Sequence, residues 1–367
     1  MDIFLQSLAF IFGSYLAFTN GMALQIESVL ADSLSIQTNE SGVILEKNTE
    51  AVAFEPRKLD STYAGNNSIP DILIRNTAYQ KAAVVESIDP STAGASTLEA
   101  LVNIFCSYTT DTYTKTTTGT GFFIDTDGII LTNAHVAQFL LLEGLVGEAK
   151  CTIRTGDPAV AMYEADLLYI PPAWVRKNAK LINDASPKGT GERDYALLYV
   201  TSGLNNKPMP SRFPALPFDT QSLTTDIVDT EVFATGYPAE SMLEMGISSP
   251  LVPKQATTSI GELMTFGSNL VDLFTIRGSA IGEHGSSGGP VVNKEGKAIG
   301  IISTKGDDTN FGEGSLRAIS LAYIDRTIKE ETLYSLTQNL GGNLPRRAQI
   351  FKETIVPFLQ AELKNEL

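Results

Sequence analysis

A series of short apolar stretches runs from about residue 98 to residue 328, and turn-forming residues separate them. The stretches are rich in Val, Ile, Phe and Tyr, which strands favour, while Gly, Asp, Asn and Pro stand between them. Only residues 134–142 read as a short helix within this part. Many short strands joined by turns are typical of an all-β sandwich or barrel. The sequence therefore predicts an all-β domain over residues 98–328.

The residues before this domain differ from it. Residues 3–18 form an apolar run without charge, which resembles the core of a secretory signal or a short membrane anchor. The basic residues that normally precede such a core are absent, and a buried helix is the alternative. We assign residues 1–24 to a signal peptide or membrane anchor. Residues 25–97 are polar with weak periodicity, which predicts a linker or stalk with one short helix around residues 70–85.

The C-terminal residues 329–367 change character again, because their apolar residues recur at helical spacing. They are predicted to form a helical tail. Pro357 is expected to kink or shorten the last helix, since proline has no backbone N–H to donate. The chain of 367 residues is long enough for one large domain with a substantial core, and 43% of it is hydrophobic.

Charge and composition exclude several classes of function. The chain has 27 Lys and Arg against 42 Asp and Glu, a net charge of −15, and it has no basic run. Phosphate contacts need clustered basic side chains, so we expect no nucleic-acid partner. Two His and two Cys are too few for a zinc site unless carboxylates supplied most of the ligands, so we also expect no metal.

The strongest local signal is the motif HGSSGGP at residues 284–290. Glycines around a serine allow a tight turn that exposes the hydroxyl and leaves room for a substrate. The same turn can direct the N–H groups of Gly285 and Ser287 to one point, which would make an oxyanion hole. The alternative is an ordinary Gly/Ser loop, so the rest of the sequence has to decide.

The order of His and Ser along the chain separates two kinds of reaction centre. Residues 285–289 also fit the G-x-S-x-G motif of α/β-hydrolases, but that fold requires its His after the Ser. Here His135 and His284 both precede Ser287. The order His, Asp, Ser remains, which is that of chymotrypsin-like enzymes.

Two residues fit the other places of such a triad. His135 follows a predicted hairpin that turns at residues 125–128, and it enters a short helix, so it is held rigidly enough to act as a general base. Asp194 begins a strongly apolar strand. Its carboxylate should be partly buried and should need a partner such as an imidazole N–H. Asp166 and Asp184 are the alternatives, but neither leads such a strand.

With these residues in place, the sequence resembles a known family. The segments GTGFFIDTDGIILTNAHV, DYALLYV, VFATGYP and GSSGGPVVNKEGKAIGI resemble successive blocks of trypsin-like serine peptidases of the HtrA-like bacterial type. The resemblance implies a chymotrypsin-like double β-barrel with the active site between the barrels. It implies His135 as general base, Asp194 as its orienting carboxylate and Ser287 as nucleophile, with an oxyanion hole made by the N–H groups of Gly285 and Ser287.

The resemblance also implies a function. We expect a serine endopeptidase that works through an acyl-enzyme, without metal or organic cofactor, on polypeptide substrates such as exported or misfolded proteins. A catalytically silent protein of the same fold that binds or chaperones polypeptides is the alternative. The family often carries a PDZ domain, but the helical C-terminal segment does not fit one. The sequence leaves the oligomeric state open.

Departures from the family concern specificity and activation. Ile281 stands six residues before Ser287, where trypsin has the Asp that binds Lys and Arg. With Ile301, Ile302 and Ser303 as expected pocket walls, we predict an uncharged pocket for small or medium apolar side chains. Ser286 replaces the Asp that pairs with a new N-terminus in digestive enzymes, so that route of activation is not expected.

The two cysteines are relevant to the cellular compartment of the protein. Cys106 and Cys151 lie in segments that both read as strands. In an exported protein a disulfide between neighbouring strands is reasonable, and two buried free thiols are the alternative. We expect a bacterial protein that is exported, whether periplasmic, extracellular or membrane-anchored, with membrane association through residues 3–18.

Overall fold

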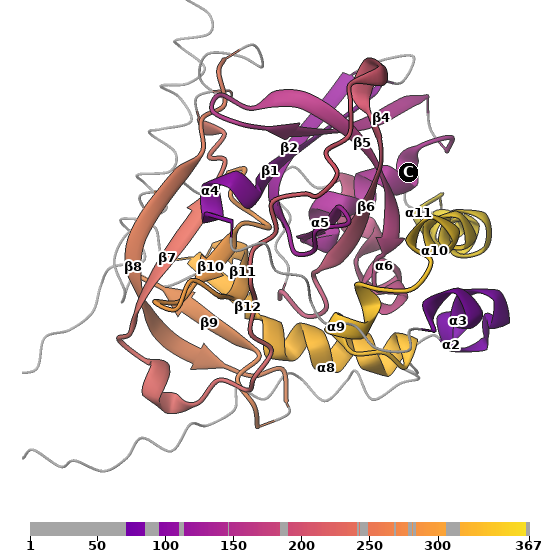
Figure 1. Ribbon diagram of the computed structural model, residues 1–367. Helices are drawn as coiled ribbons and strands as arrows, with labels where there is room; N and C mark the ends of the chain where they lie inside the picture. Colours follow the sequence, from indigo (N-terminus) through magenta and orange to yellow (C-terminus); the bar gives the residue numbers. More distant parts are fainter. Residues whose placement is uncertain are drawn as a thin grey trace, which may run out of the picture. The chain divides into compact units, whose positions relative to one another are not determined.

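Two closed antiparallel β-barrels form the centre of the structure, a computed structural model (Figure 1). The predicted chymotrypsin-like double β-barrel with C-terminal helices is thereby confirmed. The structure describes residues 71–84, 95–109, 114–145, 147–183, 190–240, 242, 249–267, 269–277, 281, 284–305 and 316–364. The predicted signal or anchor at residues 1–24 and most of the predicted linker lie outside these residues.

The first barrel has the strand order β1-β2-β3-β6-β5-β4. Its strands are β1 (Leu101–Thr109), β2 (Thr114–Phe123), β3 (Ile129–Thr132), β4 (Glu148–Thr155), β5 (Val160–Tyr169) and β6 (Ala196–Gly203). The predicted hairpin is the pair β2 and β3. It turns at Gly128, whose φ of 91° lies in the left-handed region that glycine adopts without strain.

The second barrel has the strand order β10-β11-β12-β9-β8-β7. Its strands are β7 (Glu231–Gly236), β8 (Lys254–Met264), β9 (Leu273–Ile276), β10 (Pro290–Val292), β11 (Ala298–Lys305) and β12 (Leu316–Ser320). Branched and aromatic side chains such as Val232, Ile260, Phe274, Ile276 and Val291 fill its interior. Closure of both sheets leaves no long edge within either barrel for another strand to pair with.

Helices lie before, between and after the strands. Those before and within the barrels are α2 (Ile72–Arg75), α3 (Thr77–Ala83), α4 (Thr97–Ala100), α5 (Ala134–Ala137), η2 (Gln138–Leu142), α6 (Pro172–Asn178), η3 (Ala179–Asn183), η4 (Leu204–Asn206) and η5 (Thr225–Ile227). Those after the barrels are α8 (Leu321–Thr332), α9 (Leu336–Asn339), α10 (Leu344–Ile350), η7 (Phe351–Ile355) and α11 (Val356–Lys364). Because α8 begins directly after β12, the predicted domain boundary at residue 328 falls inside a helix.

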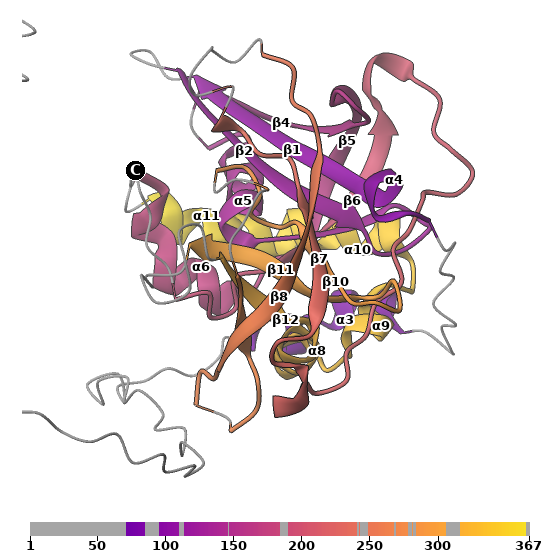
Figure 2. The same ribbon diagram turned by 90° about the vertical axis from the view of Figure 1, so that its left-hand side faces the viewer.

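Part of the predicted linker packs on the C-terminal helices. Figures 1 and 2 both show α3 close to α10. Tyr79 of α3 is fully buried, and its hydroxyl accepts a hydrogen bond from the guanidinium of the equally buried Arg347 at 3.1 Å. The backbone N–H of Asn343 donates to the carbonyl of Ala82 at 3.1 Å. Residues 71–83 are therefore not a free stalk but belong to the same packed unit as the barrels.

The last helical segment is bent rather than ended at its proline. Residues 344–364 are helical throughout, but the five residues of η7 form a π-helical turn between α10 and α11. Pro357 is the second residue of α11 and has no N–H for the carbonyl of Glu353. Such wide turns accommodate an interrupted hydrogen-bond ladder. The expected disturbance by Pro357 therefore takes the form of a π-turn.

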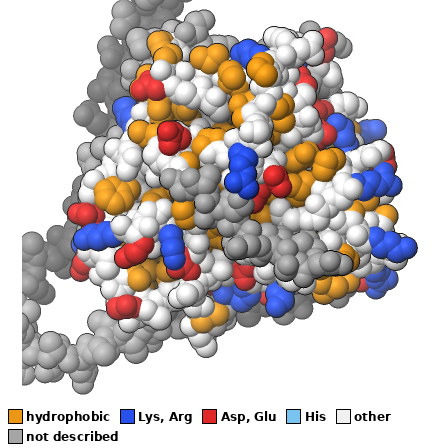
Figure 3. Space-filling view, in the orientation of Figure 1, with side chains coloured by type: hydrophobic (Ala, Val, Ile, Leu, Met, Phe, Trp, Pro, Cys, Tyr) orange, Lys and Arg blue, Asp and Glu red, His pale blue; other side chains and the backbone are white. Residues whose placement is uncertain are grey.

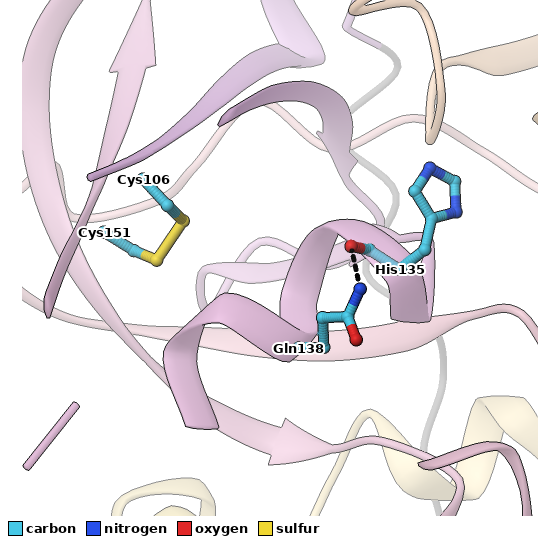
Figure 4. The surroundings of a disulfide bond; sticks show 4 residues. All are labelled: Cys106, His135, Gln138 and Cys151. Carbon is cyan, nitrogen blue, oxygen red and sulfur yellow. Dashed lines mark hydrogen bonds between the residues drawn. A yellow bond between two sulfur atoms is a disulfide. The ribbon is translucent and has the colours of Figure 1, made fainter. Parts of the chain in front are cut away.

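Cys106 and Cys151 form a disulfide that joins β1 to β4. The two residues are direct partners in the register of these strands, so their side chains point to the same face of the sheet. Figure 4 shows the disulfide beside the helical segment that carries His135 and Gln138. The Gln138 side chain donates to the His135 carbonyl at 2.9 Å, and the His135 imidazole points away from the disulfide.

Charges of both signs are interspersed on the face shown in Figure 3, so the net charge of −15 does not gather there into one acidic patch. Among the residues that the structure describes, no helix is both long enough and apolar enough to cross a membrane. The apolar run at residues 3–18, on which the predicted membrane association depends, lies outside them.

Candidate active site

The pairing of β3 with β6 brings His135 and Asp194 together. Thr132, the last residue of β3, is paired with Ala196, the first residue of β6. The chain leaving β3 and the chain entering β6 therefore lie at the same edge of the first barrel. There Asp194 Oδ2 lies 2.8 Å from His135 Nδ1, and Asp194 Oδ1 accepts from the backbone N–H of His135 at 2.9 Å. One carboxylate thus fixes both the backbone and the ring of His135.

Two further hydrogen bonds fix Asp194 itself. The side-chain amide of Asn133 donates to its backbone carbonyl at 2.8 Å. The hydroxyl of Ser303 donates to Oδ2 at 2.7 Å. The Asp194 side chain is only 5% exposed, so these donors replace the water that the carboxylate has lost. A carboxylate held in this way gives His135 the tautomer with its proton on Nδ1, which leaves the lone pair of Nε2 free to accept a proton.

The pair perturbs the titration of both partners. Burial raises the pKa of Asp194, but the charge of His135 and the hydrogen bonds from His135 and Ser303 outweigh it and hold that pKa below 3.8. Burial lowers the pKa of His135, but the charge of Asp194 and their hydrogen bond outweigh it and raise that pKa above 6.5. The carboxylate is therefore ionised at neutral pH, and it stabilises the protonated imidazole.

Ser287 lies in the second barrel, on the loop before β10. Its hydroxyl donates to the backbone carbonyl of Ser303 at 3.1 Å. Ser303 stands on β11, which pairs with β10, so the two serines lie at the same end of this strand pair. Since the hydroxyl of Ser303 also binds Asp194, one residue links the serine of the second barrel to the carboxylate of the first. The structure thus brings Ser287, Asp194 and His135 into one hydrogen-bonded cluster.

Two glycines of the serine loop are required by its close contacts. Gly285 has a φ of 82°, and a Cβ on it would lie 2.5 Å from the carbonyl oxygen of Tyr237. Gly288 has a φ of 87°, and a Cβ there would lie 1.9 Å from the carbonyl oxygen of Thr120. No other residue could take either position without moving the backbone. Gly288 therefore lets the loop lie directly against the first barrel, and Gly285 lets it lie against the chain that follows β7.

The loop leaves two N–H groups unused. The carbonyl of His284 accepts from the N–H of Ala239 at 2.8 Å. In a trans peptide the C=O and the following N–H point in opposite directions, so the Gly285 N–H points away from Ala239. Within the described part of the chain, neither the N–H of Gly285 nor that of Ser287 has a protein acceptor. Both donors that the sequence indicated for an oxyanion hole are therefore available.

Sequence reasoning missed Thr120, which holds this loop from the other barrel. The N–H of Thr120 donates to the carbonyl of Ser287 at 2.7 Å, and its hydroxyl donates to the carbonyl of Gly285 at 2.6 Å. The same hydroxyl accepts from the N–H of Tyr237 at 2.9 Å. Thr120 lies in the GTG segment that begins the predicted hairpin, but no local pattern shows that it reaches a loop so far away in sequence.

Sequence reasoning also assigned Ser303 to a pocket wall, whereas its hydroxyl is bound to Asp194. Ile301 and Ile302 are buried in the two hydrophobic cores, and Ile281 is fully buried with its carbonyl accepting from the Ser286 hydroxyl at 3.0 Å. Several neighbouring residues, 278–280, 282–283 and 306–315, lie outside the described residues. The predicted apolar specificity pocket therefore stays a prediction.

The alternative carboxylates have other surroundings. Asp166 lies on β5 and binds Lys352 at 2.9 Å, and Asp184 lies outside the described residues. His284 is exposed, and its backbone N–H donates to Glu240 at 3.1 Å. Among the described residues, no group of three or more His, Cys, Asp and Glu is arranged to hold a metal ion. Asp194 is thus the carboxylate that contacts His135.

A buried carboxylate and imidazole on one barrel, set against a glycine-flanked serine on the other, is the arrangement of trypsin-like serine peptidases. The comparisons agree with it. A family model described as a trypsin-like peptidase domain matches residues 119–301. Serine protease HTRA1A of Danio rerio is 27% identical over 253 residues, which are 68% of this chain but only 42% of that relative. Residues 119–301 therefore form a trypsin-like peptidase domain, and the chain is similar over 68% of its length to a serine protease of the HtrA type.

Proposed function

We propose that this protein is an active endopeptidase that cleaves polypeptides through Ser287, His135 and Asp194. The observation that carries the proposal is the cluster in which Asp194 holds His135 Nδ1 at 2.8 Å while Ser303 contacts both Asp194 and Ser287. The Asp194 carboxylate fixes the His135 ring, which leaves Nε2 free to accept a proton. Ser287 lies on a loop with two N–H donors that have no acceptor among the described residues. These are the parts that acyl transfer requires.

The proposed reaction begins when the Ser287 hydroxyl turns from the Ser303 carbonyl to His135 Nε2 and attacks the substrate carbonyl. His135 takes the hydroxyl proton, and Asp194 stabilises the imidazolium that forms. The N–H groups of Gly285 and Ser287 donate to the oxyanion of the tetrahedral intermediate. His135 then protonates the leaving amine, and water hydrolyses the acyl-enzyme by the same steps in reverse order.

We further propose that the substrates are exported or misfolded polypeptides, met outside the cytoplasm. The Cys106–Cys151 disulfide supports this, because disulfides persist in oxidising compartments. The expected export or anchoring through residues 1–24 belongs to the same proposal. Expressing the full chain in a bacterium and sequencing the N-terminus of the fractionated protein tests it. A protein that stays in the cytosol with Met1 retained would contradict it.

Labelling with a fluorophosphonate tests the catalytic proposal. This reagent phosphonylates an activated serine hydroxyl, and intact-mass measurement shows the addition. We expect one stoichiometric label on the folded wild type and none on Ser287→Ala, because Ser287 is the proposed nucleophile. Ser286→Ala serves as a control in the same motif, because the Ser286 hydroxyl donates to Ile281 instead. A folded wild type that stays unlabelled, or a Ser287→Ala protein that still labels, contradicts the proposal.

One observation favours a second function, a protease fold that binds polypeptides without cleaving them. The hydroxyl of Ser287 donates to Ser303 rather than to the ring of His135. If that arrangement persisted with a polypeptide bound, the serine would not be activated. The labelling experiment separates the two functions, since a silent binding protein would retain unfolded polypeptides on a column but would take up no fluorophosphonate.

The pH dependence of kcat/KM follows from the raised pKa of His135. Below that pKa the imidazole is protonated and cannot accept the serine proton, so the rate should fall about tenfold per pH unit toward acid. Because the charge of Asp194 raises the pKa of His135, we expect the midpoint of this limb above 6.5. Hydrolysis of a peptide ester and of a peptide amide, each measured across the range in which the fold is stable, should give the same midpoint. A flat profile through this range would contradict the assignment of His135.

A further inference from the structure

Both sequence neighbours of Asp194 are bound to helix α8, which Figure 1 shows below the barrels. On one side the guanidinium of Arg193 donates to Glu331 at 2.8 Å. On the other side the Tyr195 hydroxyl shares a hydrogen bond of 2.8 Å with the Thr327 hydroxyl. Thr327 and Glu331 stand one helical turn apart on the same face of α8. The backbone around Asp194 is thus attached to α8 on both sides.

Arg193 is held by hydrogen bonds of both its backbone and its side chain. Its φ of 56° lies in the left-handed region, which is strained for a residue with a side chain. The backbone N–H donates to the hydroxyl of Tyr323 at 3.2 Å, and the guanidinium binds Glu331, Glu330 and the carbonyl of Thr327. A strained conformation persists only where its surroundings determine it. Among the described residues, the side chains that hydrogen-bond to Arg193 all belong to α8.

Glu331 is the buried member of this group, with a fully inaccessible side chain, whereas Glu330 is 42% exposed. Burial raises the pKa of Glu331 to about 7, and the opposing charge of Arg193 lowers it. A buried carboxylate is costly to desolvate and adds little net stability over an apolar side chain. Stability alone is therefore a poor account of its presence, while a role in fixing Arg193 explains it.

We propose that α8 positions the catalytic carboxylate by holding its two neighbours, Arg193 through Glu331 and Tyr195 through Thr327. The Asp194 side chain is already bound by His135 and Ser303, but those bonds form only if the backbone delivers the carboxylate to the right place. Glu331 is accordingly a positioning residue and touches neither substrate nor His135. The inference rests on the proposed function, because it concerns the rate at which Ser287 is activated.

The test compares four variants with the wild type. Glu331→Met removes the acceptor but keeps the length of the side chain, and Glu331→Gln keeps an oxygen that can accept from Arg193. Thr327→Val removes the hydroxyl that binds Tyr195 and keeps the shape. Glu353→Met replaces an exposed glutamate of η7 by methionine in the same way and serves as the matched control for Glu331→Met. The readouts are the rate of fluorophosphonate labelling, the melting temperature, and the pKa of His135 from its imidazole proton resonances.

The chain has only two histidines, so the resonances of His135 are assigned by comparison with a His284→Ala variant. We expect Glu331→Met to slow labelling about 10- to 100-fold, because small displacements of a catalytic group have effects of this size. We also expect its His135 pKa to fall toward 6.5, since a displaced Asp194 no longer stabilises the imidazolium. Glu331→Gln should recover most of the rate, Thr327→Val should show a smaller loss with the same direction of pKa change, and Glu353→Met should match the wild type.

A folded Glu331→Met protein with the wild-type labelling rate and the wild-type His135 pKa overturns the proposal. If that variant does not fold, Thr327→Val decides, and wild-type values for it overturn the proposal equally. Loss of melting temperature with an unchanged rate and pKa would mean that α8 only stabilises the fold. Failure of the proposed function gives a different result, because then the wild type itself takes up no label.

Discussion

Replacing Asp194 by asparagine is expected to lower the kcat of peptide cleavage by about four orders of magnitude while the fold remains intact. The amide has nearly the shape of the carboxylate, so it fits among the donors from His135 and Ser303. It removes the negative charge that stabilises the imidazolium. It can also present an N–H to His135 Nδ1, which places the ring proton on Nε2 and leaves no lone pair to accept the proton of Ser287.

The measurement is kcat for a peptide amide, together with the melting temperature. Asp166→Asn is the matched control, because Asp166 also lies in the first barrel but binds the exposed Lys352. We expect the control to keep kcat within about twofold, as surface ion pairs contribute little. The His135 pKa should fall in Asp194→Asn, since both the charge and the hydrogen bond that raise it are changed. Wild-type kcat in Asp194→Asn would remove Asp194 from the mechanism.

The sequence is informative where the signal is local. The hairpin before His135 carries its own turn residues, and the serine loop carries its own glycines, so both were predictable from a few consecutive residues. The choice of Asp194 over Asp166 also depended on a local property, the apolar strand that follows it. The pairing of β3 with β6 then brings His135 and Asp194 together. Chain order thus predicted the arrangement without any knowledge of the contacts.

Contacts between distant residues left no such signal. Ser303 lies 109 residues after Asp194, and the hydroxyl of Thr120 reaches a carbonyl 165 residues further on. Each is a small polar residue in a strand, and nothing in its immediate sequence distinguishes it from a surface residue. The pairing of Arg193 with Glu331 spans 138 residues and is equally invisible. The interactions that position the catalytic residues can therefore be identified only from the structure.

The packing of residues 71–83 onto the C-terminal helices was also not predictable from the sequence. Leu73, Tyr79 and Ala83 are buried, but they are too few to give a strong periodicity in a polar segment. Their neighbour in the C-terminal helices is Arg347, a fully buried arginine whose partners are Tyr79, Asn339 and the carbonyl of Gly341. From sequence alone, an arginine is normally expected at the protein surface. Because a buried arginine makes the contact, the packing of the predicted linker could not be predicted from hydrophobicity.

Replacing Thr120 by valine is expected to lower kcat by about 100-fold and to destabilise the fold. Valine keeps the shape but removes the hydroxyl that donates to the Gly285 carbonyl and accepts from the Tyr237 N–H. Thr120 is fully buried, so each group left without a partner costs about 1–3 kcal/mol of unfolding free energy. The peptide that joins Gly285 to Ser286 is then free to turn, and the Gly285 and Ser287 N–H groups on either side of it are no longer held toward the oxyanion. Losing one such donor lowers kcat by about 10² to 10³.

The two consequences are separable by experiment. Thr120→Ser keeps the hydroxyl and should retain most of kcat, while Thr116→Val makes the same change at an exposed position of β2 and should leave kcat unchanged. Because the oxyanion donor acts in the transition state, Thr120→Val should lower kcat with little change in KM. A stable Thr120→Val protein with wild-type kcat would mean that the contacts of Gly288 with Ile302 and of Gly289 with Ser286 hold the loop without the first barrel. Equal losses in the valine and serine variants would mean that the methyl group of Thr120 is required as well as its hydroxyl.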